Sequence, residues 1–223
     1  MTHIVTNVSK YDKKRWKVTL DEGAVTFLLY NGELKYIQGG AGNGPAAEGL
    51  LAAGKEAGEG ICQNAPEISG DAYERIMEEV LLPRAKKRVL FYLKGGDKTE
   101  FQIKSKLREG FYPEEIIEKT MEFLKKYSLS DDRRYAENFV ASRSESLSKR
   151  ELEAKLLAKG VDRNDIKRIL EERSGEDEYT ACEKAAKKHF TGDRNRDIQY
   201  LMRKGYSFDA IEHAVNAAYK ENN

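Results

Sequence analysis

The side chains that could do chemistry are few, and they are far apart in the sequence. The three histidines, His3, His189 and His213, have no nucleophile and no ligand-spaced partner near them. Motifs such as Gly-x-Ser-x-Gly, His-Glu-x-x-His and Cys-x-x-Cys, which activate a serine or hold a metal ion, are absent from the sequence. Cys62 and Cys182 stand 120 positions apart, which favours two free thiols in a reducing compartment. We predict that the protein is not an enzyme and uses no catalytic residue, metal or cofactor.

One segment is similar to a nucleotide-binding loop. Residues 49–55, Gly-Leu-Leu-Ala-Ala-Gly-Lys, match the first seven positions of a P-loop. The next residue is Glu56, where a P-loop has the serine or threonine that ligates Mg²⁺. No buried strand leads into the segment, and no strand–helix–strand pattern follows it. A nucleotide-dependent enzyme is therefore the least favoured alternative, and ATP would have to raise the melting temperature to support it.

The residue types between positions 131 and 143 are less ordinary. If this segment is helical, four apolar residues form one stripe: Tyr135, Ala136, Phe139 and Val140. Asp132 and Arg143 continue the stripe at its two ends, since each lies three or four residues from an apolar member. Two interpretations stay open. Either Asp131 or Asp132 caps the helix and Arg143 binds its last carbonyls, or these charged residues contact a partner.

The elements that would hold these residues recur along the chain. Gly110, Gly160 and Gly205 each follow an apolar-periodic run, and an apolar residue follows each of them at once. An isoleucine stands six positions after each glycine: Ile116, Ile166 and Ile211. The spacings between the glycines are 50 and 45 residues, which is typical of stacked supersecondary units that cannot bury their apolar faces alone. We predict that each glycine ends the second helix of a unit in left-handed geometry.

The helical pattern predicts a repeat body over residues 71–223. Thr99 and Ser148 each have a glutamine or glutamate three positions later, and this spacing predicts capping boxes at the start of second helices. The fold class that follows is mainly α, with three tandem three-helix repeats forming an elongated curved solenoid behind a small antiparallel β meander. The three modules are predicted at about 84–127, 131–173 and 176–220.

Residues 1–38 have the composition of that β meander. Runs rich in β-branched and aromatic residues alternate with turn residues, and the predicted strands are 3–8, 15–20, 25–30 and 34–37. Asn31-Gly32 is the strongest hairpin signal among the turns. A meander of this size is marginal alone, so we expect it to pack on the helices.

Residues 39–70 are predicted to be an acidic linker, because glycine and alanine dominate the segment. A helical pattern follows over residues 71–82. Pro83 either ends that helix or begins the next one at its first turn.

Composition limits the class of protein. Charged residues make up 35% of the 223 residues and apolar residues 39%, with a formal net charge of +1, which suits slender helices with wide solvated faces. The charges sum to +2 over residues 1–38, −6 over 39–82 and +5 over 83–223, and a basic helical body is a weak indication of an anionic partner. No apolar run approaches the length that spans a bilayer. We expect a soluble, cytoplasmic monomer that binds no membrane.

The sequence resembles the RecX family of recombination regulators. The resemblance is carried by Leu129-Ser-Asp131-Asp132-x-x-Tyr135-Ala136, by Arg143, and by a Leu-x-x-Lys-Gly160 pattern followed by Ile166. It is strongest over residues 84–172, and Arg15-Trp-Lys-Val-Thr-Leu-Asp-Glu-Gly23 is similar to the opening hairpin of members with a strand-rich extension. Two positions depart from the family pattern. Tyr135 stands where phenylalanine is common, and residues 94–103 replace the usual Arg-x-Arg-Ser-x-x-Glu-Leu entry to the second helix.

The resemblance implies a regulator of homologous recombination and DNA repair that acts in the SOS response. Family members bind RecA filaments on single-stranded DNA, lie in the groove of the filament, and mostly inhibit the recombinase ATPase and strand exchange. The implied partners are the RecA recombinase filament and the single-stranded DNA within or beside it. We expect the middle module to make the contacts. The candidate partner-binding residues are Asp132, Arg133, Arg134, Arg143, Lys149, Arg150, Lys155 and Lys159.

A different interpretation is a direct DNA-binding helical-repeat protein, because three-helix units resemble helix-turn-helix modules. No strongly basic recognition helix stands out in the sequence, which counts against it. Salt-dependent binding to duplex DNA without RecA would favour this alternative. For each candidate basic residue, a solvated helix face is the other explanation.

Overall fold

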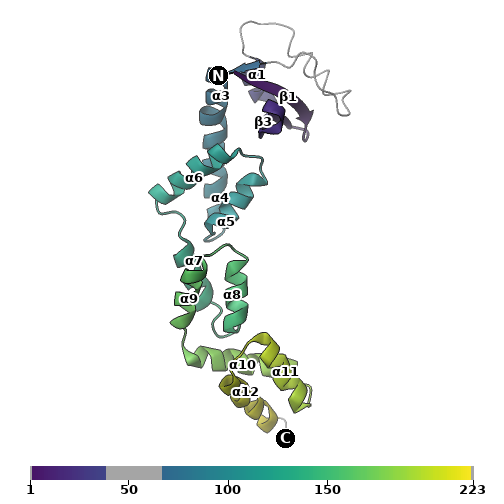
Figure 1. The fold of residues 1–223 in the computed structure, drawn as a ribbon, viewed down its shortest axis with the longest axis vertical. Helices are drawn as coiled ribbons and strands as arrows, with labels where there is room; N and C mark the ends of the chain where they lie inside the picture. Colours follow the sequence, from purple (N-terminus) through teal and green to yellow (C-terminus); the bar gives the residue numbers. More distant parts are fainter. Residues whose placement is uncertain (1, 39–66, 222–223) are drawn as a thin grey trace. The chain divides into compact units, whose positions relative to one another are not determined.

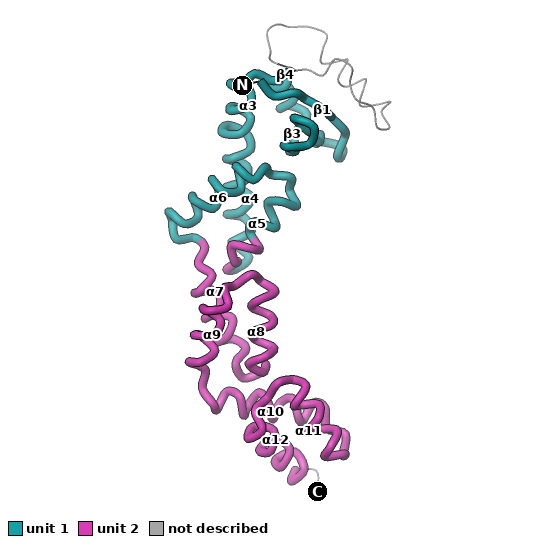
Figure 2. The backbone as a smooth tube through the Cα atoms, viewed as in Figure 1, with its two compact units in different colours: residues 1–96, 103–129 teal, residues 97–102, 130–223 magenta. Residues whose placement is uncertain are grey.

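The structure, a computed structural model, describes residues 2–38 and 67–221. Figure 1 shows the fold of the chain. The chain forms two units, which are Met1–Gly96 with Ile103–Leu129, and Asp97–Gln102 with Ser130–Asn223. We call them unit 1 and unit 2, and Figure 2 shows them in different colours. The start of helix α5 (Glu100–Arg108) therefore belongs to unit 2 and the rest of that helix to unit 1.

Unit 1 begins with an antiparallel sheet whose strand order is β3-β2-β1-β4. Apolar residues of the first three strands face the interior, and Val5, Val18 and Phe27 are fully buried. The predicted strands at 3–8, 15–20 and 25–30 are thereby confirmed. The four strands are β1 (Thr2–Lys10), β2 (Arg15–Leu20), β3 (Val25–Tyr30) and β4 (Glu67–Ser69).

The predicted strand at 34–37 and the predicted Asn31-Gly32 hairpin are wrong. Residues 31–33 form a short 3-10 helix, η2 (Asn31–Glu33), which leads into helix α1 (Lys35–Gln38). Leu34 and Ile37 are both buried. A strand would point them to opposite faces, whereas a helical turn places residues three apart on the same side.

The fourth strand comes from a segment that was predicted to be linker. Strand β4 pairs with β1, with Ile68 opposite His3, so the predicted linker over 39–70 is wrong at its C-terminal end. Its earlier part lies outside the described residues, as do the P-loop-like segment 49–55 and Cys62. Because β1 and β4 are about sixty residues apart, local sequence pattern could not reveal their pairing.

A continuous helical backbone follows the sheet. It consists of α3 (Gly70–Arg75), a π-helical turn η3 (Ile76–Leu81) and α4 (Leu82–Leu93). Pro83 lies in the first turn of α4, which is the second of the two predicted alternatives. The residues at both junctions have right-handed helical φ and ψ, so the chain does not break there. Pro83 has no N–H to donate, and a proline is tolerated in the first turn of a helix for that reason.

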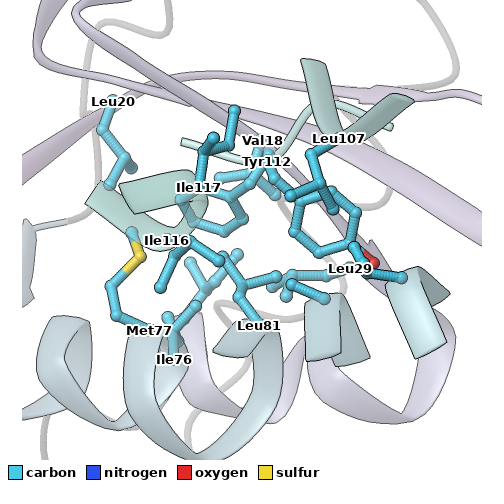
Figure 3. Packing of buried hydrophobic residues seen from close by; sticks show 14 of the residues in the cluster. Val18, Leu20, Leu29, Ile76, Met77, Leu81, Leu107, Tyr112, Ile116 and Ile117 are labelled. Atoms are coloured by element: carbon cyan, nitrogen blue, oxygen red, sulfur yellow. The ribbon is translucent and has the colours of Figure 1, made fainter. Parts of the chain in front are cut away.

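The sheet and the first helical module share one hydrophobic core. Figure 3 shows Val18, Leu20 and Leu29 of the sheet beside Met77 and Ile117 of the helices, all at most 1% exposed. The same cluster contains buried side chains from η3 and α4, from α5 and from α6 (Glu114–Lys126). The expectation that the meander packs on the helices is therefore confirmed, and the first 38 residues do not form a core of their own.

Unit 2 contains the second and third modules, and each has its own buried cluster. Leu152 and Leu156 belong to the core of the second module, and Leu201 and Ile211 to the core of the third. The mainly α class with three-helix modules is confirmed, and the curved solenoid stays a prediction. Within the described ranges, no helix is long and apolar enough to cross a membrane. The helices are α7 (Asp132–Ala141), α8 (Lys149–Leu157), α9 (Arg163–Glu171), α10 (Gly175–His189), α11 (Arg194–Lys204) and α12 (Phe208–Glu221).

The ends of the second helices show which sequence positions are equivalent in the three modules. In each module one backbone N–H donates to the carbonyl of a leucine five residues earlier. The pairs are Tyr112 to Leu107 (3.2 Å), Val161 to Leu156 (3.2 Å) and Tyr206 to Leu201 (3.4 Å). The residue before each donor has left-handed φ, and these residues are Phe111 (56°), Gly160 (79°) and Gly205 (85°). The predicted role of Gly110 is therefore wrong by one residue, because Phe111 takes that position.

The one-residue shift from Gly110 to Phe111 also applies to the isoleucine that follows in the first module. Each module has an isoleucine whose N–H donates at 3.0 Å to the residue just before the third helix begins: Ile117 to Pro113, Ile166 to Asp162 and Ile211 to Ser207. Ile117 therefore replaces Ile116 as the counterpart of the other two. Ile116 and Ile117 are both fully buried, so burial alone could not distinguish them.

Candidate partner-binding surface

The second and third modules are joined by a serine that caps one helix and reaches the next module. Ser148 Oγ accepts from the N–H of Glu151 (3.2 Å) and donates to the carbonyl of Lys204 (2.6 Å). Lys204 Nζ in turn lies 2.5 Å from Glu151 Oε1. Ser148 is fully buried, so this hydroxyl is shielded from water, which makes its partners costly to remove.

A close backbone approach accompanies this junction. A Cβ placed on Gly205 would lie 2.7 Å from the Cβ of Arg150, so the glycine is needed for space as well as for its φ. The two ends of the side chain of Arg150, a predicted contact residue, therefore have different surroundings. Its stem packs on Gly205, while the residue as a whole remains exposed.

The same arrangement recurs one module earlier, wholly within unit 2. Thr99 Oγ1 donates to the carbonyl of Lys159 (2.6 Å), and a Cβ on Gly160 would collide with Phe101. Thr99 and Ser148 are both fully buried, and both predicted capping boxes are present, since Thr99 N–H also donates to Gln102 Oε1 (3.1 Å). We call this arrangement the module joint: a buried cap hydroxyl bound to the residue before a left-handed glycine.

The two aspartates that begin α7 have different roles. Asp131 is the N-cap and accepts from the N–H of Arg134 (3.0 Å), which confirms one of the two interpretations for that residue. Asp132 is partly buried, and its Oδ1 accepts from the N–H of Glu100 at the start of α5 (2.8 Å). Its carboxylate therefore links α7 to the first residue of α5, which belongs to unit 2.

The two predicted arginines on the first turn of α7 form exposed ion pairs. Arg133 Nε lies 2.9 Å from Glu137, and one terminal nitrogen of Arg134 lies 3.8 Å from Asp97. Pairs of this kind contribute little to stability in water. Both cations stay accessible to a partner that could replace their carboxylates.

The predicted lysines on α8 are exposed. For Lys149 and Lys155, the described part of the chain records no carboxylate within ion-pair distance. Lys159 is partly buried, and its Nζ lies 5.9 Å from the centre of the Tyr135 ring. A lysine whose ammonium group forms no ion pair can attract a negatively charged partner.

Four residues of the second module form a row in which two aromatic rings lie between two cations. Lys159 lies over Tyr135, the Tyr135 and Phe139 rings stack with centroids 6.2 Å apart, and the Arg143 guanidinium lies 5.6 Å from the Phe139 ring centre. We call these four residues the cation–aromatic row. Of the predicted site residues, the structure brings Arg143 and Lys159 into it.

The sequence pattern did not reveal the two rings of this row as surface groups. Tyr135 and Phe139 were assigned to one apolar stripe with Ala136 and Val140, but only Ala136 and Val140 are buried. Tyr135 and Phe139 are partly buried and lie at the margin of that face. The available signal was their four-residue spacing, which stacks side chains along one side of a helix.

The remaining reactive side chains have structural partners. His3 Nδ1 lies 2.6 Å from Asp21 Oδ2, His189 stacks on Tyr200 at 3.7 Å, and His213 lies 3.1 Å from Glu183. Cys182 is a free thiol, as predicted. It is buried, and burial raises its pKa to about 12. Among the described residues, no group of three or more metal-ligating side chains comes together.

Comparison with known proteins places the first two modules in one family. Residues 85–124 match the family described as RecX, first three-helix domain, and residues 131–170 match RecX, second three-helix domain. The third module has no counterpart in these two matches, although its helices follow the same plan.

Matches over about two thirds of the chain agree. The chain is 33% identical over 165 residues to the Regulatory protein RecX of Clostridium acetobutylicum, which covers 69% of this chain and 77% of that one. A Clostridium perfringens protein of the same name is 29% identical over 158 residues, covering 66% and 74%.

Solved structures share the fold. A crystal structure of regulatory protein RecX has a TM-score of 0.58 at 22% identity and covers 96% of this chain and 99% of its own. The RecX structure from Lactobacillus salivarius has a TM-score of 0.51 at 23% identity and covers 63% and 97%. With the two matched domains and the relative from Clostridium acetobutylicum, the finding is plain: this chain belongs to the RecX family of regulatory proteins.

Proposed function

We propose that the protein regulates homologous recombination by binding RecA filaments on single-stranded DNA and slowing the recombinase ATPase and strand exchange. Its membership of the RecX family supports a regulatory role, since its relatives carry the name Regulatory protein RecX. The partner follows from the family resemblance, and the chemistry of the second module supports it.

The observation that carries the proposal is the cation–aromatic row. Two partly buried rings lie between two cations, and the described part of the chain records no carboxylate paired with Arg143 or Lys159. Rings of this kind give apolar contact area at low entropic cost, and flanking cations favour an anionic surface. A nucleoprotein filament offers both protein surface and phosphate.

The backbone that carries Lys159 and Tyr135 is held by hydrogen bonds. The Lys159 carbonyl is bound by the buried Thr99 hydroxyl, and Tyr135 lies on α7, whose N-terminus is capped by Asp131. Fixing these groups before binding reduces the entropy that a partner must remove. Lys149 and Lys155, which are exposed on α8, add positive charge to the same module.

A filament-binding measurement tests the proposal. Wild-type protein should sediment with RecA filaments formed on single-stranded DNA. Replacing both cations of the row, Arg143→Gln with Lys159→Gln, should weaken this binding about tenfold, since each exposed ion pair with an anionic partner contributes up to about 1 kcal/mol and two would be lost.

A matched variant controls for lost charge. Lys167→Gln with Lys184→Gln removes the same charge from α9 and α10, where each lysine is exposed and has a carboxylate partner at 3.8 Å or less. This control should bind like the wild type. Equal losses in both double variants would show that net charge alone matters, and no sedimentation of wild-type protein would refute the proposal.

A further inference from the structure

Arg173 is a buried arginine at the boundary between the second and third modules. It lies after the end of α9 and just before Ser174, the N-cap of α10 (Figure 1). The residue is only 8% exposed, and among the residues that the structure describes it is the only lysine or arginine that is buried. A cationic side chain is rarely buried this far unless its charge is paired. The function proposed above gives Arg173 no role.

The guanidinium of Arg173 has fewer partners than it can bind. Its Nη2 donates to the carbonyl of Ser144, in the segment 142–147 between α7 and α8. Its Nε and Nη1 are buried too, and within the described ranges neither has a hydrogen-bond partner. Burial lowers the pKa of Arg173 accordingly. A guanidinium has five N–H donors, so the observed arrangement leaves much of the cost of burying this charge uncompensated.

Two carboxylates lie near Arg173 without binding it. Glu178 and Asp177 stand in the first two turns of α10, and their charges partly offset the effect of burial on the pKa of Arg173. The described part of the chain records no ion pair between Arg173 and either acid. Glu178 Oε1 instead accepts from the N–H of Ser207 at 3.1 Å. Both acids are partly exposed, so a guanidinium bound to them would also meet water.

The possible partners of Arg173 belong to different modules. Ser144 is in the second module, whereas Asp177 and Glu178 begin the third. When Arg173 binds Ser144, it connects the start of α10 to the segment 142–147. When it binds the carboxylates, it is bound only within the third module. These are two discrete arrangements of one side chain, and the connection between the modules exists in only one of them.

The other contacts at this boundary determine what can move. The module joint holds Ser148 to Lys204 through a buried hydroxyl. The segment 142–147 also contacts α10 through the ion pair of Glu145 with Lys184 at 3.0 Å, whose side chains are 62% and 54% exposed. An exposed pair of this kind contributes little to stability. Release of Arg173 would therefore free the segment 142–147 from α10 and leave the module joint intact.

We propose that Arg173 is a latch between the second and third modules. In the latched arrangement its guanidinium binds the Ser144 carbonyl, as in this structure. In the released arrangement the side chain turns to Glu178 and Asp177, and the third module pivots about the module joint. A partner that binds one arrangement more tightly shifts the equilibrium toward it. The latch does not depend on which partner the second module binds.

Distances between two spin labels, measured by double electron–electron resonance, test the latch. The labels are attached in the full chain at Ala141→Cys, at the end of α7, and at Lys188→Cys on α10, which are both exposed positions. Cys62→Ser removes one natural thiol, and the other, Cys182, is buried and therefore inert to the label. The wild-type sequence should give two distances, of which the longer belongs to the released arrangement.

Two substitutions of Arg173 should have opposite effects. Arg173→Met removes the buried charge and keeps a long unbranched side chain, so the population at the longer distance should fall about tenfold. Arg173→Lys keeps the charge, but an ammonium group is more strongly hydrated than a guanidinium, so that population should rise about threefold. If Arg173 only tied the modules together or filled space, both substitutions would loosen the boundary.

Arg168→Met is the matched control. Arg168 is exposed on α9, and the described part of the chain records no carboxylate within ion-pair distance of it. This control should leave both distances and their populations unchanged, and thermal melting checks that each variant is folded. A single distance in the wild type would overturn the proposal, and so would a larger population at the longer distance in Arg173→Met.

Discussion

At the scale of single residues, the module joint depends on glycine for two separable reasons. Gly205 and Gly192 both have left-handed φ, but a Cβ on Gly205 would meet Arg150, whereas a Cβ on Gly192 would meet nothing within 4 Å. Gly192→Ala should therefore lose about 1 kcal/mol of unfolding free energy from backbone strain alone. Gly205→Ala should lose about 2–4 kcal/mol, because the new methyl group also separates the modules. Urea unfolding measures both losses. Equal losses would mean that the close approach to Arg150 contributes nothing to the cost of the Gly205→Ala substitution.

The cap hydroxyls of the joint allow a second comparison. Ser148 is buried and binds both the Glu151 N–H and the Lys204 carbonyl, whereas Ser174 is an exposed cap that accepts from the Glu176 N–H (3.2 Å). Ser174→Ala should cost about 1 kcal/mol, the usual cost of a lost cap. Ser148→Ala should cost about 2–3 kcal/mol, because it also leaves a buried carbonyl without its donor. If thermal or urea unfolding shows the two variants to be equally stable, the joint is not a source of stability.

At the scale of elements, the pair formed by Glu151 and Lys204 gives the joint a pH dependence. Burial tends to raise the pKa of Glu151, but hydrogen bonds from Lys204 and the Ser148 backbone outweigh it, so the pKa falls below its ordinary 4.5. Hydrogen bonding to Glu151 raises the pKa of Lys204 above its ordinary 10.5. The stabilisation is therefore complete between these two ordinary values, and it is lost as pH falls through the folded pKa of Glu151 or rises through that of Lys204.

Glu151→Gln should consequently destabilise the protein at neutral pH and have less effect in acid. We expect a loss of about 1 kcal/mol at pH 7, because the pair is only partly buried, and a smaller loss at about pH 3.5. Glu145→Gln, which breaks the exposed pair with Lys184, should have no measurable effect at either pH. A loss from Glu151→Gln that does not change with pH would contradict the assigned role of its charge.

The elements that local sequence pattern predicted are those whose signals are local. Three of the four predicted strands, the capping boxes at Thr99 and Ser148, and the modules' helices all formed as expected. The misplaced elements depended on distant partners. Strand β4 pairs with β1 across the sequence, and Leu34 is buried through a helical turn next to the Arg84–Glu33 pair.

The candidate site was predictable only in part, for a related reason. Arg143 and Lys159 were selected for their charge, but their neighbours Phe139 and Tyr135 looked like core residues. Asp132 was selected as a contact residue, and the structure shows its carboxylate bound to the Glu100 N–H. Which side of an amphipathic helix becomes the exposed margin depends on the helices packed against it, and those contacts are not encoded in spacing alone.

At the scale of the molecule, the first and third modules each differ from the other two at one position of the module joint. The first module has Phe111 at the joint position, and that residue meets Tyr11 of the sheet within unit 1. The third module has Asp193 where the other two have Thr99 and Ser148. Asp193 is exposed and caps α11 by accepting from the Asn195 N–H (3.0 Å). A charged, solvated cap forms no module joint, because that joint needs a buried hydroxyl.

We propose that this member of the RecX family restrains the RecA recombinase, and the DNA-dependent ATPase of RecA tests this proposal most directly. Wild-type protein should slow ATP hydrolysis by RecA on single-stranded DNA in a concentration-dependent way, and the variant with Arg143→Gln and Lys159→Gln should need about tenfold more protein for the same effect. The variant with Lys167→Gln and Lys184→Gln should act like the wild type. An ATPase rate that stays unchanged at every ratio of wild-type protein to RecA, with no binding to the filament, would contradict the claim.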